Sequence, residues 1–153
     1  MKRTIIVFTL TLLLSSAVCL AQNSQIGTWK LNEAKSKIPA GATKNHTVIY
    51  APAGDNVKVT VEGTDASGKA VHHEWTGKMD GKFYPVTGDP TSDSRSYKKL
   101  SDRTLTMTAK QGAKVTMTGR IVIAADGKSR TVTTTSTDAK GKKTSATVVY
   151  DKQ

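Results

Sequence analysis

Two neighbouring histidines and a glutamate are the residues of this chain that most resemble a metal-binding set. His72, His73 and Glu74 follow one another in a stretch of alternating apolar and polar residues. If that stretch is a strand, His72 and Glu74 share one face and His73 lies on the other. Two ligands do not make a zinc site, and His46 would have to complete it from a neighbouring strand. We therefore predict no metal site, and we expect His73 to face inward as a polar group.

Arg95 and Tyr97 place a cation and a phenol on one face of a second predicted strand. A buried guanidinium would need an anion or a carboxylate beside it, because an unpaired buried charge is costly. The same stretch carries Lys98 and Lys99, which favours a strand face turned to water. We expect Arg95 to face solvent, and we keep Tyr97 as a candidate polar contact for a ligand.

Catalytic and cofactor motifs do not stand out in the sequence. The serines lie in predicted loops without the pattern of a nucleophile elbow. No Gly-rich loop precedes a helix, so no nucleotide site is indicated. We predict no catalytic residues, no cofactor and no enzymatic activity. The alternative is an isomerase or hydrolase that uses His73 together with Tyr97 or a carboxylate.

The elements that would position these residues are strands. Short stretches of alternating apolar and polar residues recur after residue 22, separated by turns that contain Gly and Asp. Asp80-Gly81 is typical of a tight hairpin turn, and Pro85 indicates an edge or irregular strand. A short helical turn or loop is predicted over residues 33–42. Strands are predicted over residues 26–32, 46–51, 56–64, 70–78, 82–87, 94–100, 104–110, 114–124, 129–137 and 144–151.

Short connections after residue 45 make consecutive strands antiparallel neighbours. A sheet of about eight to ten such strands twists and curls until its edges meet. We predict an all-β protein, a single antiparallel up-and-down meander closed into a barrel, with a two-sheet β-sandwich as the alternative. On the longest strand we expect Val115, Met117, Ile121 and Ile123 to share the inner face.

The first 21 residues resemble an export signal. Basic residues precede an apolar run from Ile5 to Leu14 that is too short to span a bilayer, and small residues then suit signal peptidase. We expect a cleaved signal peptide over residues 1–21, one barrel domain over residues 22–153, and a periplasmic or secreted location. Lipidation of Cys19, the single cysteine, and an N-terminal membrane anchor are the alternatives.

The chain is strongly basic, with a net charge of +11. Its lysines lie mostly in predicted turns and at strand ends, and no basic helix or basic-aromatic ladder is present. Charges in such positions are typical of strand edges that are protected against pairing. We predict no nucleic-acid partner and no stable membrane insertion after signal removal. A basic surface that meets an anionic partner stays open as an alternative role.

Gly27-Thr28-Trp29, early on the first predicted strand, resembles the G-x-W signature of the lipocalins and their calycin relatives. The stretches 27–37, 84–88 and 149–152 also resemble small bacterial secreted lipocalin-like proteins. The resemblance implies a barrel in which Trp29 closes one end and a basic side chain, here Lys152, packs across it. The fatty-acid-binding proteins, which are related, hold a carboxylate with an R-x-Y pair on a late strand. Here that pair lies mid-chain, and the two-helix lid of those proteins is missing.

The resemblance implies a ligand inside the barrel. We expect an exported protein that binds a small, partly hydrophobic or amphipathic molecule. Burial of apolar ligand surface, at about 25 cal/mol per Å², would supply the affinity, and a few polar groups would fix the orientation. The alternative is a non-enzymatic structural or interaction module with a filled barrel. The residues predicted to line the barrel are Trp29, Leu31, Val59, His73, Trp75, Tyr97, Leu105, Met107, Met117, Ile121 and Tyr150.

Overall fold

The structure, a computed structural model, describes residues 23–153. The predicted signal peptide and Cys19 lie outside the described residues. Ten strands and one short 3-10 helix, η1, make up the fold. Their bounds are β1 Gly27–Leu31, η1 Glu33–Lys35, β2 Lys44–Ala53, β3 Asn56–Thr64, β4 Ala70–Gly77, β5 Asp80–Thr87, β6 Ser94–Ser101, β7 Thr104–Gln111, β8 Lys114–Ile123, β9 Ser129–Thr137 and β10 Lys143–Lys152.

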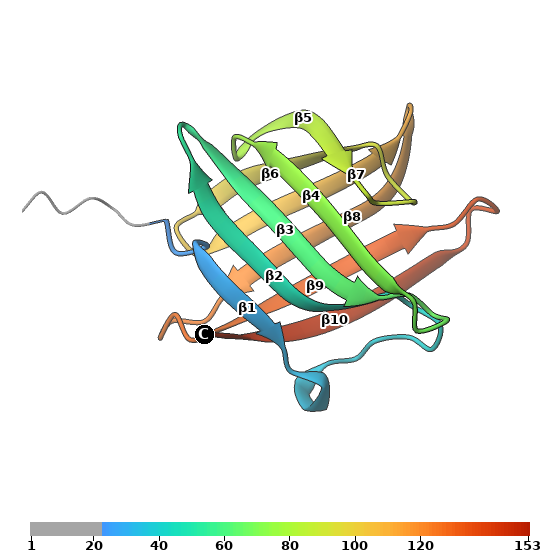
Figure 1. Ribbon diagram of the computed structural model, residues 1–153, viewed down its shortest axis with the longest axis horizontal. Coiled ribbons are helices and arrows are strands. Elements are labelled where there is room, and N and C mark those ends of the chain that lie inside the picture. The colour runs from blue at the N-terminus through green and yellow to red at the C-terminus, as the bar shows by residue number, and fades with distance from the viewer. Residues whose placement is uncertain (1–22) are drawn as a thin grey trace, which may run out of the picture.

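The strands close into a barrel in chain order, and β1 completes the circle by pairing with both β2 and β10 (Figure 1). Trp29 on β1 lies opposite Val48 on β2 and opposite Lys152 on β10, with all neighbours antiparallel. The predicted all-β, up-and-down closed barrel is therefore confirmed. The two-sheet sandwich is wrong, because no pair of free sheet edges remains.

The barrel has two different ends. The η1–β2 segment and the β3–β4, β5–β6, β7–β8 and β9–β10 turns gather at one end, on the right of Figure 1. We call this end the mouth. The remaining turns and the C-terminus lie at the opposite end, on the left, which we call the closed end.

Register shifts occur in four of the ladders and a fifth ladder is short, and two of these irregularities bear on the predictions made above. The ladder between β4 and β5 pairs Glu74 with Thr87 and Trp75 with Val86 and then stops, on the strand that carries Pro85. Proline lacks an N–H to donate, which agrees with the predicted irregular strand.

The second irregularity is a register shift between Ala109 and Lys110, where β7 pairs with β8. One extra residue in a strand reverses which side chains point inward beyond it. Thr116 therefore lies toward the interior, and Val115 is 41% exposed. The prediction that Val115 shares the inner face of this strand is wrong for this reason.

Trp29 plugs the closed end. Its side chain is 0% exposed, and its indole Nε1 donates a hydrogen bond of 2.9 Å to the carbonyl oxygen of Gln25. The Nζ of Lys152 lies 5.1 Å from the centre of the indole ring. This is the arrangement that the lipocalin resemblance implied for these two residues.

A second cation at the closed end was not predicted. Arg130 on β9 is 2% exposed, and its guanidinium lies 4.7 Å from the ring centre of Trp29, 4.8 Å from Tyr50 and 5.1 Å from Tyr150. Burial raises the pKa of Tyr150 to about 12, so this phenol stays neutral. Within residues 23–153, Nε and Nη1 of Arg130 have no hydrogen-bond partner. The faces of three aromatic rings thus take the place of an anion around the charge.

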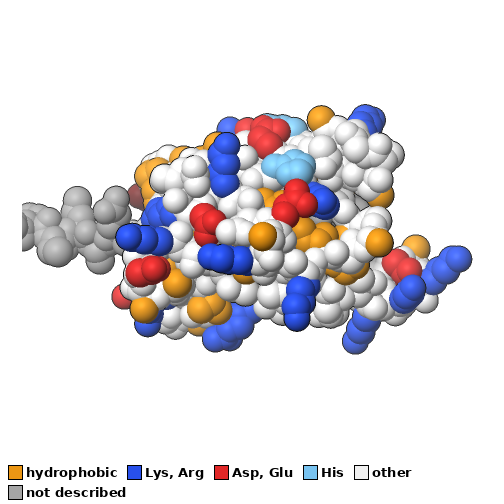
Figure 2. All heavy atoms as spheres, turned by 90° about the horizontal axis from the view of Figure 1, so that it is seen from below, with side chains coloured by type: hydrophobic (Ala, Val, Ile, Leu, Met, Phe, Trp, Pro, Cys, Tyr) orange, Lys and Arg blue, Asp and Glu red, His pale blue; other side chains and the backbone are white. Residues whose placement is uncertain are grey.

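Charged side chains are scattered over the outer face that Figure 2 draws. Figure 2 shows lysine and arginine side chains spread over one face, with a group of them on the projecting β9–β10 turn. Apolar side chains are visible in a hollow on the right-hand half of that view, which is the mouth half. In the part of the chain that the structure describes, no helix is both long and apolar enough to cross a bilayer.

Candidate ligand cavity

The barrel holds a cavity of about 850 Å³ that extends to the mouth. Side chains from every strand except β1 and β5 line it, and the mouth turns add the rim. The interior is therefore not filled by side chains, which the alternative of a packed barrel would require. A space of this size falls in the range of known small-molecule sites.

The predicted lining residues divide into two groups. Those that line the cavity are His73, Tyr97, Met107, Met117, Ile121 and Tyr150. Those that do not are Trp29, Val59, Trp75 and Leu105, all buried in the core, and Leu31, half-buried against it. The second group belongs to the hydrophobic core or packs against it. That any of these residues contacts a ligand stays a prediction.

Several apolar residues of the wall were missed. Alternation along β2 and β3 places Val48, Tyr50 and Val61 on the inner face, so the sequence contained the signal for them. Val132 and Val148 face each other across β9 and β10 and also line the cavity. The wall in the middle of the barrel is consequently mostly aliphatic and aromatic.

Arg95 lies inside the barrel, and the prediction that it faces solvent is wrong. It is 6% exposed, lines the cavity, and donates from Nη2 to Oδ2 of Asp89 at 2.7 Å. The carboxylate that an inward arginine requires is supplied by the β5–β6 turn of the chain itself. The backbone carbonyl of Arg95 also accepts a 2.9 Å hydrogen bond from the indole Nε1 of Trp75, which fixes the start of β6.

Asp89 is held by its own turn. Its Oδ1 accepts hydrogen bonds from the backbone N–H of Thr91 at 2.9 Å and from the Thr91 hydroxyl at 2.7 Å. Its Oδ2 accepts from the Ser92 hydroxyl at 2.6 Å, besides the bond from Arg95. Burial alone would raise the pKa of Asp89, but the hydrogen bonds from Ser92 and Thr91 and the charge of Arg95 lower it below its ordinary value. The carboxylate is therefore ionised at neutral pH.

Gly88 brings this turn close to β4. Its φ is +78°, a conformation that side chains rarely adopt, and a Cβ there would clash with the carbonyl oxygen of His72. Only glycine allows this close approach. The backbone of Gly88 thus helps to place Asp89, the next residue, beside β4 and β6.

His73 completes the polar cluster, which we define as Asp89, Arg95, His73 and Tyr97. The His73 Nδ1 lies 3.8 Å from Oδ2 of Asp89, and Nε2 is buried without a hydrogen-bond partner in the described chain. Burial and then the charge of Arg95 lower the pKa of His73 below its ordinary value. The imidazole is consequently neutral at pH 7.

The lowered pKa of His73 predicts a loss of stability in mild acid. The unfolded chain takes up a proton at this histidine near pH 6.5, whereas the folded protein does so only at lower pH. The free energy of unfolding should therefore fall as the pH decreases from 7 to 5, by at most about 1.4 kcal/mol per pH unit. Urea unfolding at several pH values measures it. His73→Gln should remove this part of the slope and His46→Gln should retain it; an unchanged slope in His73→Gln would contradict the assignment.

The other two histidines, His72 exposed and His46 half-buried, do not join a common site. His72 contacts Glu62, with Nδ1 2.6 Å from Oε1, and its Nε2 lies 3.7 Å from Glu74. His46 bonds to the hydroxyl of Thr64 at 2.9 Å. Among residues 23–153 no three His, Cys, Asp or Glu side chains converge as metal ligands would.

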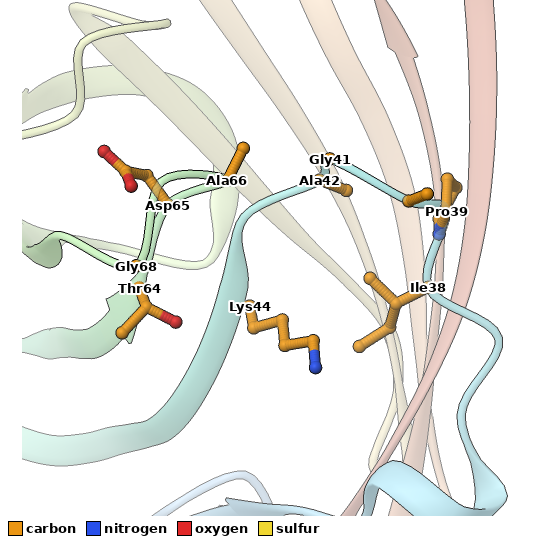
Figure 3. A pocket seen from close by; sticks show the side chains of 10 residues that line it. Ile38, Pro39, Gly41, Ala42, Lys44, Thr64, Asp65, Ala66 and Gly68 are labelled. Carbon is orange, nitrogen blue, oxygen red and sulfur yellow. The ribbon is translucent and has the colours of Figure 1, made fainter.

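A smaller hollow of about 480 Å³ adjoins the mouth. Figure 3 shows Ile38 and Pro39 on one side of it, with Thr64 at the end of β3 and Asp65 on the β3–β4 turn opposite. The segment from Ile38 to Ala42 borders both this hollow and the barrel cavity. It therefore forms one side of the entrance.

Comparisons with known proteins identify similar solved structures. A redesigned β-barrel, mFAP1, bound to DFHBI is 16% identical, with a TM-score of 0.47 over 86% of this chain and 97% of that chain. The structure of EF1p2_mFAP2b bound to DFHBI is 12% identical, with a TM-score of 0.49 over 87% and 97%. A redesigned β-barrel, b11L5F_LGL, is 13% identical, with a TM-score of 0.47 over 90% and 99%.

No protein-family model matches the chain, and no curated protein matches it either. The fold therefore rests on the strand pairing described above, and the site rests on the cavity and its lining.

Proposed function

We propose that this chain is an exported, lipocalin-like binding protein that holds a small, partly hydrophobic ligand in the barrel cavity. The observation that carries the proposal is the cavity of about 850 Å³, which combines a mostly apolar wall with one polar cluster. Sites for small molecules have this composition, since apolar surface supplies affinity and a few polar groups fix orientation.

Export is part of the proposal and is supported by the sequence alone. The basic start, the short apolar run and the small residues before residue 22 are typical of a cleaved signal peptide. A periplasmic or secreted binding protein would meet ligands that enter from outside the cell. Mass spectrometry of the protein purified from its own host would show whether the chain begins at Gln22.

Titration with N-phenyl-1-naphthylamine, an uncharged apolar fluorophore, tests the binding function. The wild-type protein should enhance its emission in a saturable way, with one molecule bound per chain. Ala146 lines the cavity, so Ala146→Trp should fill part of it and weaken binding at least ten-fold. Thr133→Trp, on the exposed face of the neighbouring strand, is the matched control and should bind as the wild type does.

Two outcomes would contradict the proposal. One is the absence of saturable binding by a folded wild-type protein. The other is equal binding by wild type and Ala146→Trp, which would place the fluorophore outside the cavity. Native mass spectrometry of the protein from its host adds a test for a retained natural ligand.

A further inference from the structure

We infer that the cavity selects uncharged amphiphiles with a hydrogen-bonding head group, such as a long-chain alcohol or primary amide, over carboxylates of the same length. This inference rests on the proposed function, because it names the ligand class of the same cavity. Its basis is the charge balance and the hydrogen-bonding capacity of the polar cluster.

The charges of the polar cluster already cancel. Arg95 is the cation of the cluster, and its guanidinium donates to Asp89 at 2.7 Å. Both side chains are almost fully buried, with 7% and 6% of their surface exposed. His73 adds no charge at neutral pH, as described above. The internal carboxylate therefore occupies the position that a ligand carboxylate would need in order to neutralise Arg95.

A carboxylate ligand would bring a second negative charge beside Asp89. Two carboxylates that share one guanidinium repel each other strongly where water is excluded, so the second would bind poorly or as the protonated acid. The lysines that line the cavity, Lys114 and Lys142, lie on the rim and are exposed. Asp65 and Asp138 line the same rim, so its charges also balance.

Hydrogen-bonding groups without partners remain in the cluster and near it. A guanidinium has five N–H groups, and the structure gives a bond for Nη2 of Arg95 while Nε is buried without a partner. The carboxylate of Asp89 faces Nδ1 of His73 and favours the proton there, which leaves Nε2 as an acceptor. Two further cavity residues, Asn45 and Thr116, have buried side-chain oxygens without partners in the described chain.

A head group that both donates and accepts matches this set. A hydroxyl or a carboxamide can donate to an acceptor and accept from an N–H, whereas a carboxylate can only accept. A buried polar group without a hydrogen-bond partner costs free energy. The hydrogen-bonding match therefore affects the selectivity between head groups more than the overall affinity. The apolar tail would lie along the aliphatic wall toward the closed end.

Displacement of N-phenyl-1-naphthylamine by 1-decanol, decanamide and sodium decanoate at pH 7.5 tests the inference on the wild-type protein. We expect the alcohol and the amide to displace the fluorophore at concentrations at least ten-fold lower than decanoate. The same three head groups on eight- and twelve-carbon chains show whether the order depends on tail length. Equal or stronger displacement by decanoate would overturn the inference.

Asp89→Asn tests the cause. Asparagine keeps an acceptor oxygen for the turn but removes the negative charge, so Arg95 becomes free to pair with a ligand carboxylate. Decanoate should then bind at least ten-fold more tightly than to the wild type, while binding of decanol changes less. Asp93→Asn, an exposed aspartate at the end of the same turn, is the matched control and should keep the wild-type order.

The outcomes separate this inference from the proposed function. If the folded wild type binds neither the fluorophore nor any of the three compounds, the proposed function fails. If the fluorophore binds in the cavity and decanoate is preferred, only the charge-balance inference fails. If Asp89→Asn does not fold, the order of the three compounds on the wild type still decides the question.

Discussion

Replacing Trp29 with alanine should lower the free energy of unfolding by about 4 kcal/mol, because it removes a fully buried aromatic side chain from the closed end. The indole fills the barrel between Arg130 and Lys152 and satisfies the carbonyl of Gln25. Its loss leaves a void beside the buried guanidinium of Arg130. Urea unfolding followed by circular dichroism measures the change. A variant that is unfolded without urea is the limiting form of the same result.

Two further variants make this result specific. Phe83 is also aromatic but 41% exposed, so Phe83→Ala should lower the free energy of unfolding by about 1 kcal/mol or less. Trp29→Phe keeps an aromatic ring but loses the N–H and part of the indole volume, so its loss of stability should fall between those of Trp29→Ala and Phe83→Ala. If Trp29→Ala proves no less stable than Phe83→Ala, the indole does not close the barrel in solution.

Replacing Asp89 with alanine should lower the free energy of unfolding by about 3 kcal/mol or more, because it leaves Arg95 buried without an anion. The hydroxyl of Ser92 and the N–H of Thr91 lose their acceptor as well. The double variant Asp89→Ala/Arg95→Met removes the stranded charge and should recover at least half of the loss. Urea unfolding of both variants measures the effect.

The neighbouring Asp93 provides a comparison on the same turn. It accepts a 2.6 Å hydrogen bond from the N–H of Gly112 but is exposed, so Asp93→Ala should cost about 1 kcal/mol or less. A double variant as unstable as Asp89→Ala would show that the turn hydrogen bonds, and not the charge, carry the effect. An Asp89→Ala variant as stable as the wild type would contradict the burial of the pair.

The strands could be predicted because two local signals agree along this chain. Alternation of apolar and polar residues gives the strands, and turns such as Asp80-Gly81 separate them. The observed strands match the predicted ranges to within a few residues, and β2 is the one that extends furthest beyond its range. Short turns then leave few topologies besides a meander.

The polar cluster could not be predicted in the same way, because its members meet only in three dimensions. Asp89 lies in a turn, six residues from Arg95, and no periodic pattern joins a turn carboxylate to an inward strand residue. Val115 was placed on the wrong face because a register shift leaves no mark in the residue pattern. Arg130, in contrast, lies two residues from Val132 and so on the same face of the strand. Alternation could therefore have placed Arg130 inside the barrel.

The short ladder between β4 and β5 means that the wall is not equally stiff around its circumference. Two paired positions join these strands, against nine between β9 and β10. Thermal fluctuations should therefore separate β4 from β5 before other neighbouring strands, next to the turn that carries Asp89. A ligand too broad for the mouth could then enter the cavity between β4 and β5. The width of the mouth therefore need not limit the size of the ligand.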